Sequence, residues 1–172
     1  MLRRFRSLIF LSLLVFSLIA LGSPVLSQAQ SQLPYWTEAA PPTVARQELY
    51  PAVLNGKIYV VGGLLSPNTG FSAHFESYDP SQNTWTALRP IPEARHHITL
   101  SAVNGLLYGI GGFTGGFPDW RAQPTMFIYN PAANTWSKGT DLPVARAEGI
   151  SAVVDNKIYL IGGRVRATED AR

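Results

Sequence analysis

The chain has 172 residues, a length typical of one domain, and contains no cysteine. Disulfides are therefore excluded, and an apolar core must hold the fold together. Three of the 14 Lys and Arg residues lie before residue 30, where there is no acidic residue, so the rest of the chain carries 11 charges of each sign. This balance, without a basic patch interleaved with aromatic residues, argues against nucleic acid as a partner.

Residues 1–29 have the pattern of a secretory signal peptide. Arg3 and two further arginines precede the apolar run Ser7–Leu21, and small residues at Ser27 and Ala29 fit cleavage before Gln30. The alternative is an uncleaved anchor, but the run is shorter than the ~20 residues of a membrane span. We therefore expect a secreted or periplasmic protein with no stable membrane span after cleavage.

After a polar linker over residues 30–33, one spacing organises the remaining chain, 34–172. A tryptophan is followed after 10 residues by an arginine, and after 16 more by a pair of glycines. This set recurs after 49 and then 51 residues, a period that indicates stacked all-β units. The three sets are Trp36, Arg46 and Gly62-Gly63; Trp85, Arg95 and Gly111-Gly112; and Trp136, Arg146 and Gly162-Gly163.

Each repeat is predicted to form a four-stranded antiparallel sheet. The first two strands are expected at 49–54 and 57–61, at 98–103 and 106–110, and at 150–154 and 157–161. Asn55-Gly56, Asn104-Gly105 and Asp155-Asn156 connect them, and such pairs suit the positive φ angles of a type I′ hairpin. A third strand ends at Tyr78-Asp79-Pro80 or Tyr129-Asn130-Pro131, and a fourth contains Trp85 or Trp136.

The two complete repeats differ in length only in the loop after the second strand. Gly63 to Tyr78 is 15 residues, whereas Gly112 to Tyr129 is 17. A scaffold tends to carry its specificity in segments that vary, which makes the loop 113–124 a candidate for ligand binding. It contains Trp120 and Arg121. Trp120 is interpreted either as a ligand contact or as an anchor of its own loop.

These residues resemble the kelch-repeat family over roughly 33–163, in an exported, bacterial-type form. The resemblance implies a β-propeller built of four-stranded blades. The expected pieces are a lone fourth strand (34–40), blade one (44–89), blade two (95–140) and a half blade (146–163) before a charged tail. About two and a half blades make an incomplete ring. The chain is thus expected to be the N-terminal part of a longer propeller, or else a short protein that closes by self-association.

The candidate site follows from the repeated arginines Arg46, Arg95 and Arg146. One interpretation pairs each arginine with backbone or carboxylate groups in the core. The other comes from the resemblance, since in kelch adaptors the residues just after this arginine line the mouth of the central channel. Together with Trp120 and Arg121, the candidate ligand contacts are then Arg46, Gln47, Glu48, Arg95, His96, His97, Arg146 and Glu148.

No metal and no cofactor are expected. His96 and His97 are adjacent, and adjacent residues on a strand point to opposite faces, so the pair is not predicted to hold one ion.

The function expected from these features is an exported binding module for a protein or carbohydrate ligand. The ligand would bind at the channel mouth and at the loops after the second strands. One alternative is a periplasmic sugar-active enzyme of the sialic acid mutarotase kind, with acid–base work by Glu48, His97 or Glu148. Another is a structural scaffold without a small ligand.

Overall fold

The structure, a computed structural model, describes residues 35–66, 70–167 and 169–170. The predicted signal peptide and linker lie outside the described residues. The chain divides into two units, residues 1–37 and 38–172. Residues 35–37 of the first unit form no strand, and neither do residues 38–40 of the second. The strand predicted over 34–40 is therefore wrong in its described part.

Ala40 shows why this strand does not form. Its backbone N–H donates to Oδ1 of Asn83 at 2.7 Å, and its carbonyl accepts from Nε1 of Trp85 at 2.7 Å. The backbone groups that a ladder would use are thus bonded to side chains, and Pro41 and Pro42 follow with no N–H to donate.

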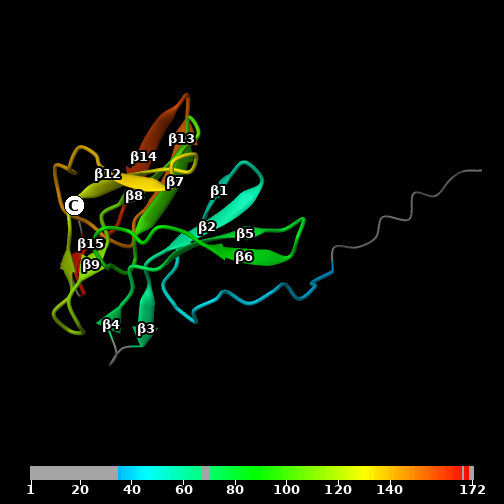
Figure 1. Cartoon of the computed structure of the whole chain (residues 1–172). Helices are drawn as coiled ribbons and strands as arrows, with labels where there is room; N and C mark the ends of the chain where they lie inside the picture. The colour runs from blue at the N-terminus through cyan, green and yellow to red at the C-terminus, as the bar shows by residue number, and fades with distance from the viewer. Residues whose placement is uncertain (1–34, 67–69, 168, 171–172) are drawn as a thin grey trace, which may run out of the picture. The chain divides into compact units, whose positions relative to one another are not determined.

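The three repeats form two four-stranded antiparallel sheets and one two-stranded sheet in the second unit (Figure 1). Blade one is β1 (Ala52–Leu54), β2 (Lys57–Val61), β5 (Phe75–Asp79) and β6 (Thr84–Ala87), paired in that order. Blade two is β7 (Thr99–Val103), β8 (Leu106–Ile110), β11 (Met126–Asn130) and β12 (Thr135–Lys138). The third sheet pairs β13 (Ile150–Val154) with β14 (Lys157–Ile161). The predicted all-β fold of about two and a half blades is confirmed.

The inner hairpins turn as their sequences predict. Asn55 and Gly56 have φ angles of 51° and 74°, and the Asn104-Gly105 and Asp155-Asn156 pairs are also positive at both positions. A type I′ turn needs this conformation, which Gly and Asn adopt more readily than other residues. The first strand of blade one is shorter than predicted, because it begins at Ala52, after Pro51, rather than at residue 49.

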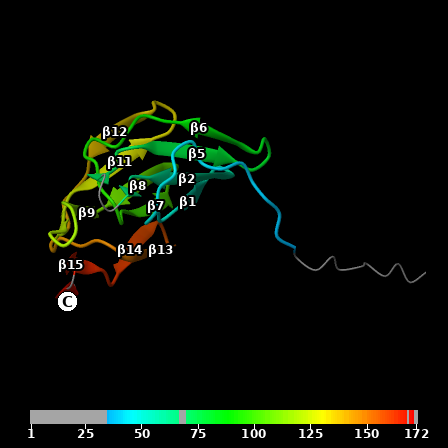
Figure 2. The ribbon, with the colours of Figure 1, turned by 90° about the horizontal axis from the view of Figure 1, so that it is seen from below.

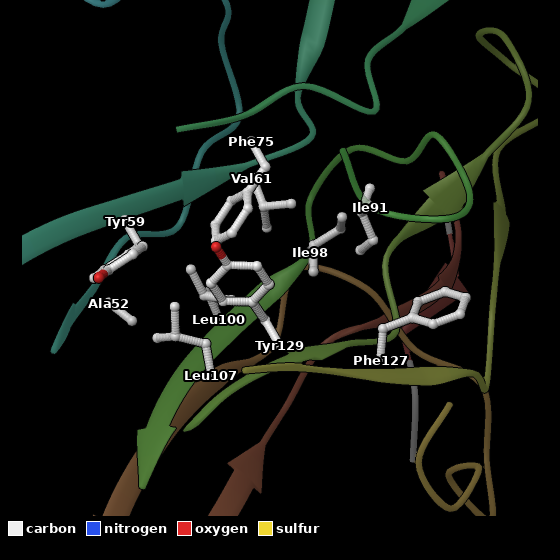
Figure 3. Packing of buried hydrophobic residues seen from close by; sticks show 10 residues of the cluster. All are labelled: Ala52, Tyr59, Val61, Phe75, Ile91, Ile98, Leu100, Leu107, Phe127 and Tyr129. Carbon is white, nitrogen blue, oxygen red and sulfur yellow. The ribbon is translucent and has the colours of Figure 1, made fainter. Parts of the chain in front are cut away.

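The core lies between blades one and two (Figure 3). The ring of Phe75, from β5, packs edge-on against Tyr129 of β11 at 4.7 Å between centroids. The indole of Trp136, from β12, lies 5.0 Å from both rings. Leu107 is fully buried beneath them. Aromatic pairs of this kind stabilise by about 0.5–1.5 kcal/mol beyond the area that they bury.

The repeated Tyr and Asn-Thr-Trp residues connect each blade to the segment that precedes it. Asn134 Oδ1 accepts from the hydroxyl of Tyr129 at 2.8 Å and from the backbone N–H of Arg89 at 2.9 Å. Trp136 Nε1 then donates to the carbonyl of Arg89 at 2.8 Å. In blade one, Asn83 and Trp85 make the same two hydrogen bonds with the backbone of Ala40. The motif therefore stabilises blade-to-blade connections and is not a ligand site.

The residues after Gly163, predicted as a charged tail, instead form strands. β15 (Arg164–Arg166) pairs with β16 (Glu169–Asp170) and with β10 (Arg121–Ala122), which in turn pairs with β9 (Phe113–Thr114). This sheet joins the loop of blade two to the third blade. The prediction failed because this strand has three residues and only one apolar side chain, while the pairing comes from backbone groups.

One face of the third sheet exposes apolar side chains. Val154 and Ile161 are 53% and 55% exposed, whereas Val103 and Ile110, at the same positions of blade two, are 8% and 4% exposed. β13 lies against β7, at the lower edge of the view in Figure 2. The third sheet helps to bury Val103 and Ile110 of blade two. The equivalent side chains of the third sheet, Val154 and Ile161, have no such cover and are exposed to solvent.

When the 172-residue chain is expressed alone, we expect this exposed face of the third sheet to pack against the third sheet of a second copy. Exposed apolar strands recruit other chains. Ile161→Lys should shift the chain from oligomer towards monomer in analytical ultracentrifugation. Leu65→Lys, at an exposed apolar residue of β3 (Leu64–Ser66), is the matched control. A wild-type chain that sediments as a single monomer would contradict this expectation.

Candidate functional site

The second residue after each repeated arginine has an unusual backbone conformation. Glu48, His97 and Glu148 have φ angles of 61°, 55° and 61°. Positive φ is uncommon for residues other than glycine and costs free energy, and strained residues of this kind cluster at binding and catalytic sites. The sequence predicted these three residues as candidate ligand contacts, and the structure gives them one shared geometry.

The glycine pairs position this segment. Gln47, His96 and Ala147 form isolated bridges with the residues just after each glycine pair: Leu64, Phe113 and Arg164. A Cβ atom on Gly63, Gly112 or Gly163 would lie 2.8, 3.0 or 2.7 Å from the carbonyl oxygen of Gln47, His96 or Ala147. Only glycine therefore allows the segment that carries the candidate residues to approach so closely.

The three residues with positive φ meet in one charged network. Nε2 of His97 lies 3.1 Å from Oε2 of Glu48 and 3.1 Å from Oε1 of Glu148. The other carboxylate oxygen of Glu148 is 2.9 Å from Nε of Arg164. The network therefore links the two blades and the third sheet at the same level of the repeat.

The two adjacent histidines lie on the same side of the chain, contrary to the prediction. Their Nδ1 atoms are 2.5 Å apart, and both residues are buried. The prediction assumed strand alternation, but β7 begins only at Thr99, and the left-handed conformation of His97 turns the backbone. At this distance one Nδ1 must carry a hydrogen and the other must accept it.

Burial lowers the pKa of both imidazoles to about 4. The neighbouring His97 lowers the pKa of His96 further, and Arg164 does the same for His97. The charge of Glu48 raises the pKa of His96, but this is the smallest of the effects on that ring. His96, which is fully buried, is therefore the clearer example of an imidazole held neutral at pH 7.

Trp120 packs over this histidine pair. Its ring lies 4.8 Å from His96, 5.1 Å from His97 and 5.5 Å from Phe113, while Phe117 lies at 5.6 Å. The indole is half-buried. Trp120 therefore anchors its loop, as one of the two interpretations predicted, and it also presents part of its ring to a pocket.

We name this cavity of about 330 Å³ the aromatic pocket. Its walls come from the loops after the second strands of blades one and two and from the segment after Arg46. Its lining includes Phe71, Phe117, Trp120, Gln47 and Glu48. The carboxylate of Glu48 is 43% exposed and gives the pocket a negative group beside apolar rings.

The repeated arginines have structural surroundings. Nη1 of Arg46 donates to the carbonyls of Gly62 at 2.6 Å and His74 at 3.0 Å, and its guanidinium pairs with Glu76. Nη1 of Arg95 donates to the carbonyls of Gly111 and Thr125, both at 3.0 Å, and its guanidinium pairs with Glu93.

Arg146 donates to the carbonyl of Gly162 at 3.1 Å. The side chains of Arg46 and Arg95 are buried and bonded within the blades, which favours the structural interpretation of these two arginines over a role as ligand contacts.

Three features of this region were missed from the sequence. Phe71, from β4 (Gly70–Phe71), lines the aromatic pocket, although no residue from the loop of blade one was among the candidate ligand contacts. Arg164 and Arg166 were assigned to a tail. A signal for Arg164 existed, since this position is apolar in the other repeats, where Leu64 and Phe113 stand.

Within the described ranges, no group of three or more His, Asp or Glu side chains is arranged to hold a metal ion. A search of these same residues finds no helix whose length and hydropathy would let it span a bilayer.

Comparison with known proteins identifies the repeat. The pattern of the Kelch motif matches residues 51–92 and 94–143. Beta-scruin of Limulus polyphemus is 33% identical over 138 residues, which is 78% of this chain and 15% of that protein. Kelch-like protein terF of Aspergillus terreus is 31% identical over 137 residues, covering 75% of this chain and 30% of that protein. The chain thus spans less than a third of the length of these relatives.

A solved structure shares the architecture. The structure of YjhT superposes with a TM-score of 0.62 at 23% identity, over 74% of this chain and 37% of that chain. This likeness supports the propeller-type arrangement of the blades described above.

Proposed function

The chain belongs to the kelch-motif family, and on this premise we propose that it is a binding module whose ligand, a segment of another protein or a carbohydrate, docks in the aromatic pocket. The observation that carries the proposal is the composition of that pocket. Aromatic rings from two different blades face a few polar groups across a cavity of about 330 Å³. Pockets that bind ligands are typically apolar and aromatic with a small number of polar groups.

The placement of the pocket supports the same proposal. It lies where the repeats differ, in the loops after the second strands, and not where they are identical. The repeated Arg and Trp residues of blades one and two are occupied with hydrogen bonds within and between blades. A ligand that touched only the variable loops would therefore leave the scaffold unchanged.

Catalysis by His97, one of the candidate acid–base residues, is disfavoured because this side chain is enclosed. The His97 side chain is 4% exposed, and its Nε2 already lies between two carboxylates. A general base must reach the proton that it abstracts, directly or through one water.

Export is part of this proposal. It rests on the signal-peptide pattern of residues 1–29, and it places the module in the periplasm or outside the cell.

The test is to select binders of the purified chain from a phage-displayed random heptapeptide library and from a printed glycan array. Trp120→Ala should raise the Kd of the selected ligand at least about tenfold, since a buried aromatic anchor is typically worth more than 1.4 kcal/mol. Tyr159→Ala, an exposed aromatic residue of β14 that lines no part of the pocket, should leave the Kd unchanged.

Circular dichroism of both variants controls for folding. If Trp120→Ala unfolds the chain while the remaining folded fraction binds as tightly as wild type, Trp120 is only a loop anchor. The pocket is then not the site. The absence of any binder in both collections would also contradict the proposed function.

A further inference from the structure

The aromatic pocket combines three aromatic rings with one carboxylate. Phe71 comes from the loop of blade one, and Phe117 and Trp120 come from the loop of blade two. The carboxylate belongs to Glu48, in the segment after Arg46. None of the described residues that line the pocket is a lysine, an arginine or a histidine. Such a site attracts a cation, because the faces of aromatic rings carry partial negative charge and the carboxylate carries a full one.

The indole of Trp120 is positioned before any ligand binds. Its ring packs on His96 and Phe113, at 4.8 and 5.5 Å between centroids, and both of these neighbours are fully buried. The ring of Phe117 lies 5.6 Å away with its plane at 76° to the indole, so the two rings form adjacent walls of the pocket. Tryptophan offers a cation the best of the aromatic faces, and a ring that is already ordered loses little freedom on binding.

The negative charge of Glu48 is available to a ligand. Its Oε2 lies 3.1 Å from Nε2 of His97. Burial and the charge of Arg164 lower the pKa of this imidazole to about 4, so His97 is neutral at pH 7 and does not cancel the charge. Arg164 itself contacts the carboxylate of Glu148, at 2.9 Å. Among the described residues, no lysine or arginine is paired with Glu48, whose side chain is 43% exposed.

The contacts of Glu48 favour an ammonium group over a guanidinium. A guanidinium binds a carboxylate best when its planar fork reaches both oxygens. Because Oε2 already lies against His97, Oε1 is the oxygen left for a ligand. An ammonium group is a compact charge that needs only one oxygen, and the aromatic rings can cover its other sides.

The size and surroundings of the pocket narrow the ligand further. Its volume of about 330 Å³ is near the lower end of the range for ligand sites, about 300–1,000 Å³, which suits one side chain better than several sugar rings. The nearest arginine of the loop, Arg121, lines a separate cavity together with the carboxylate of Asp119. The aromatic pocket itself is thus left with a negative lining.

We propose that the aromatic pocket binds the ammonium group of a lysine side chain in a peptide segment, between the face of Trp120 and the carboxylate of Glu48. This inference rests on the proposed function and chooses between its two ligand classes, because a neutral sugar carries no cation. The methylene groups of the lysine would pack along Phe71 and Phe117, as long basic side chains do on apolar surfaces.

The experiment sequences the heptapeptides that the wild-type chain selects from the random library. We expect enrichment of Lys over Arg, Asp and Glu. For a synthetic peptide from this pool, labelled with fluorescein, Glu48→Gln should raise the Kd at least about tenfold in fluorescence anisotropy. Glutamine keeps the shape of the side chain and can still accept from His97. Glu38→Gln removes the same charge at an exposed residue outside the pocket and should change the Kd less than about twofold.

Modified peptides test the same point with the wild-type protein, so misfolding of a variant cannot imitate the result. Acetylation of the lysine removes its charge and should raise the Kd at least about tenfold. Trimethylation keeps the charge and should leave the Kd within about threefold of the unmodified peptide, since aromatic sites also bind quaternary ammonium groups.

The outcomes separate this inference from the proposed function. Peptides without a lysine bias, equal binding of the acetylated peptide, or unchanged binding by Glu48→Gln would overturn the inference, while a loss of affinity in Trp120→Ala would still support the proposed function. Binders from the glycan array alone would also overturn only the inference. A failure to select any binder, or binding that Trp120→Ala leaves unchanged, would contradict the proposed function itself.

Discussion

Replacing Arg46 with alanine is expected to lower the free energy of unfolding by about 3–5 kcal/mol, because it leaves a buried carboxylate without its counter-charge. The side chains of Arg46 and Glu76 are both fully buried. The same change removes donors from the carbonyls of Gly62 and His74. Urea denaturation at pH 7, followed by circular dichroism, measures the effect.

The repeat itself supplies the control. Arg146 occupies the same position in the third sheet, where its hydrogen bond to the carbonyl of Gly162 is solvent-exposed, so Arg146→Ala should cost about 1 kcal/mol or less. Equal losses for the two variants would contradict the burial argument.

A second variant tests the charge directly. Glu76 is buried, which by itself raises its pKa, but hydrogen bonds from Thr43 and the charge of Arg46 outweigh this and hold its pKa below the ordinary value. Replacing both partners by Arg46→Met and Glu76→Gln should therefore recover much of the stability that Arg46→Ala loses. If the double variant is as unstable as the single one, packing and not charge explains the loss.

The blades could be predicted because their determinants are local and repeated. Asn55-Gly56 sets a turn within two residues, and the same signal occurs in each copy. The requirement for glycine at position 63 is explained by one nearby group, the carbonyl oxygen of Gln47. Three registered copies make such local signals add up, so the strands were placed to within a few residues.

The site could be predicted only in part, because its contacts join residues that no spacing relates. Glu48, His97 and Glu148 were identified from their repeated position, but their meeting depends on the curvature between blades. The close approach of His96 and His97 depends on one left-handed residue. The strand at Arg164–Arg166 depends on a partner, β10, that lies more than 40 residues earlier in the chain.

The stability of the chain is expected to fall as the pH drops from about 6.5 towards 4. His96 has a pKa of about 4 in the folded protein, whereas an imidazole exposed by unfolding has a pKa near 6.5. Between pH 6.5 and about 4 this imidazole binds a proton in the unfolded chain but not in the folded chain. Lowering the pH through this range therefore favours unfolding. Above about pH 6.5 both states are neutral at this residue and its contribution is complete.

The full difference in pKa corresponds to about 3 kcal/mol for one imidazole, and about 2–3 kcal/mol of it should be lost by pH 4.5. The charged and titratable groups around His96 and His97 are Glu48, Glu148, Tyr50 and Arg164. A wild-type curve alone therefore cannot assign the loss to His96.

His96→Gln provides the matched comparison, since glutamine is the residue that repeat one carries at this position, in Gln47. The free energy of unfolding is measured by urea denaturation from pH 7.5 to 4.5 for both proteins. Wild type should lose about 2–3 kcal/mol more than His96→Gln over this range. Parallel pH curves for the two proteins would show that His96 is not the group whose protonation destabilises the fold.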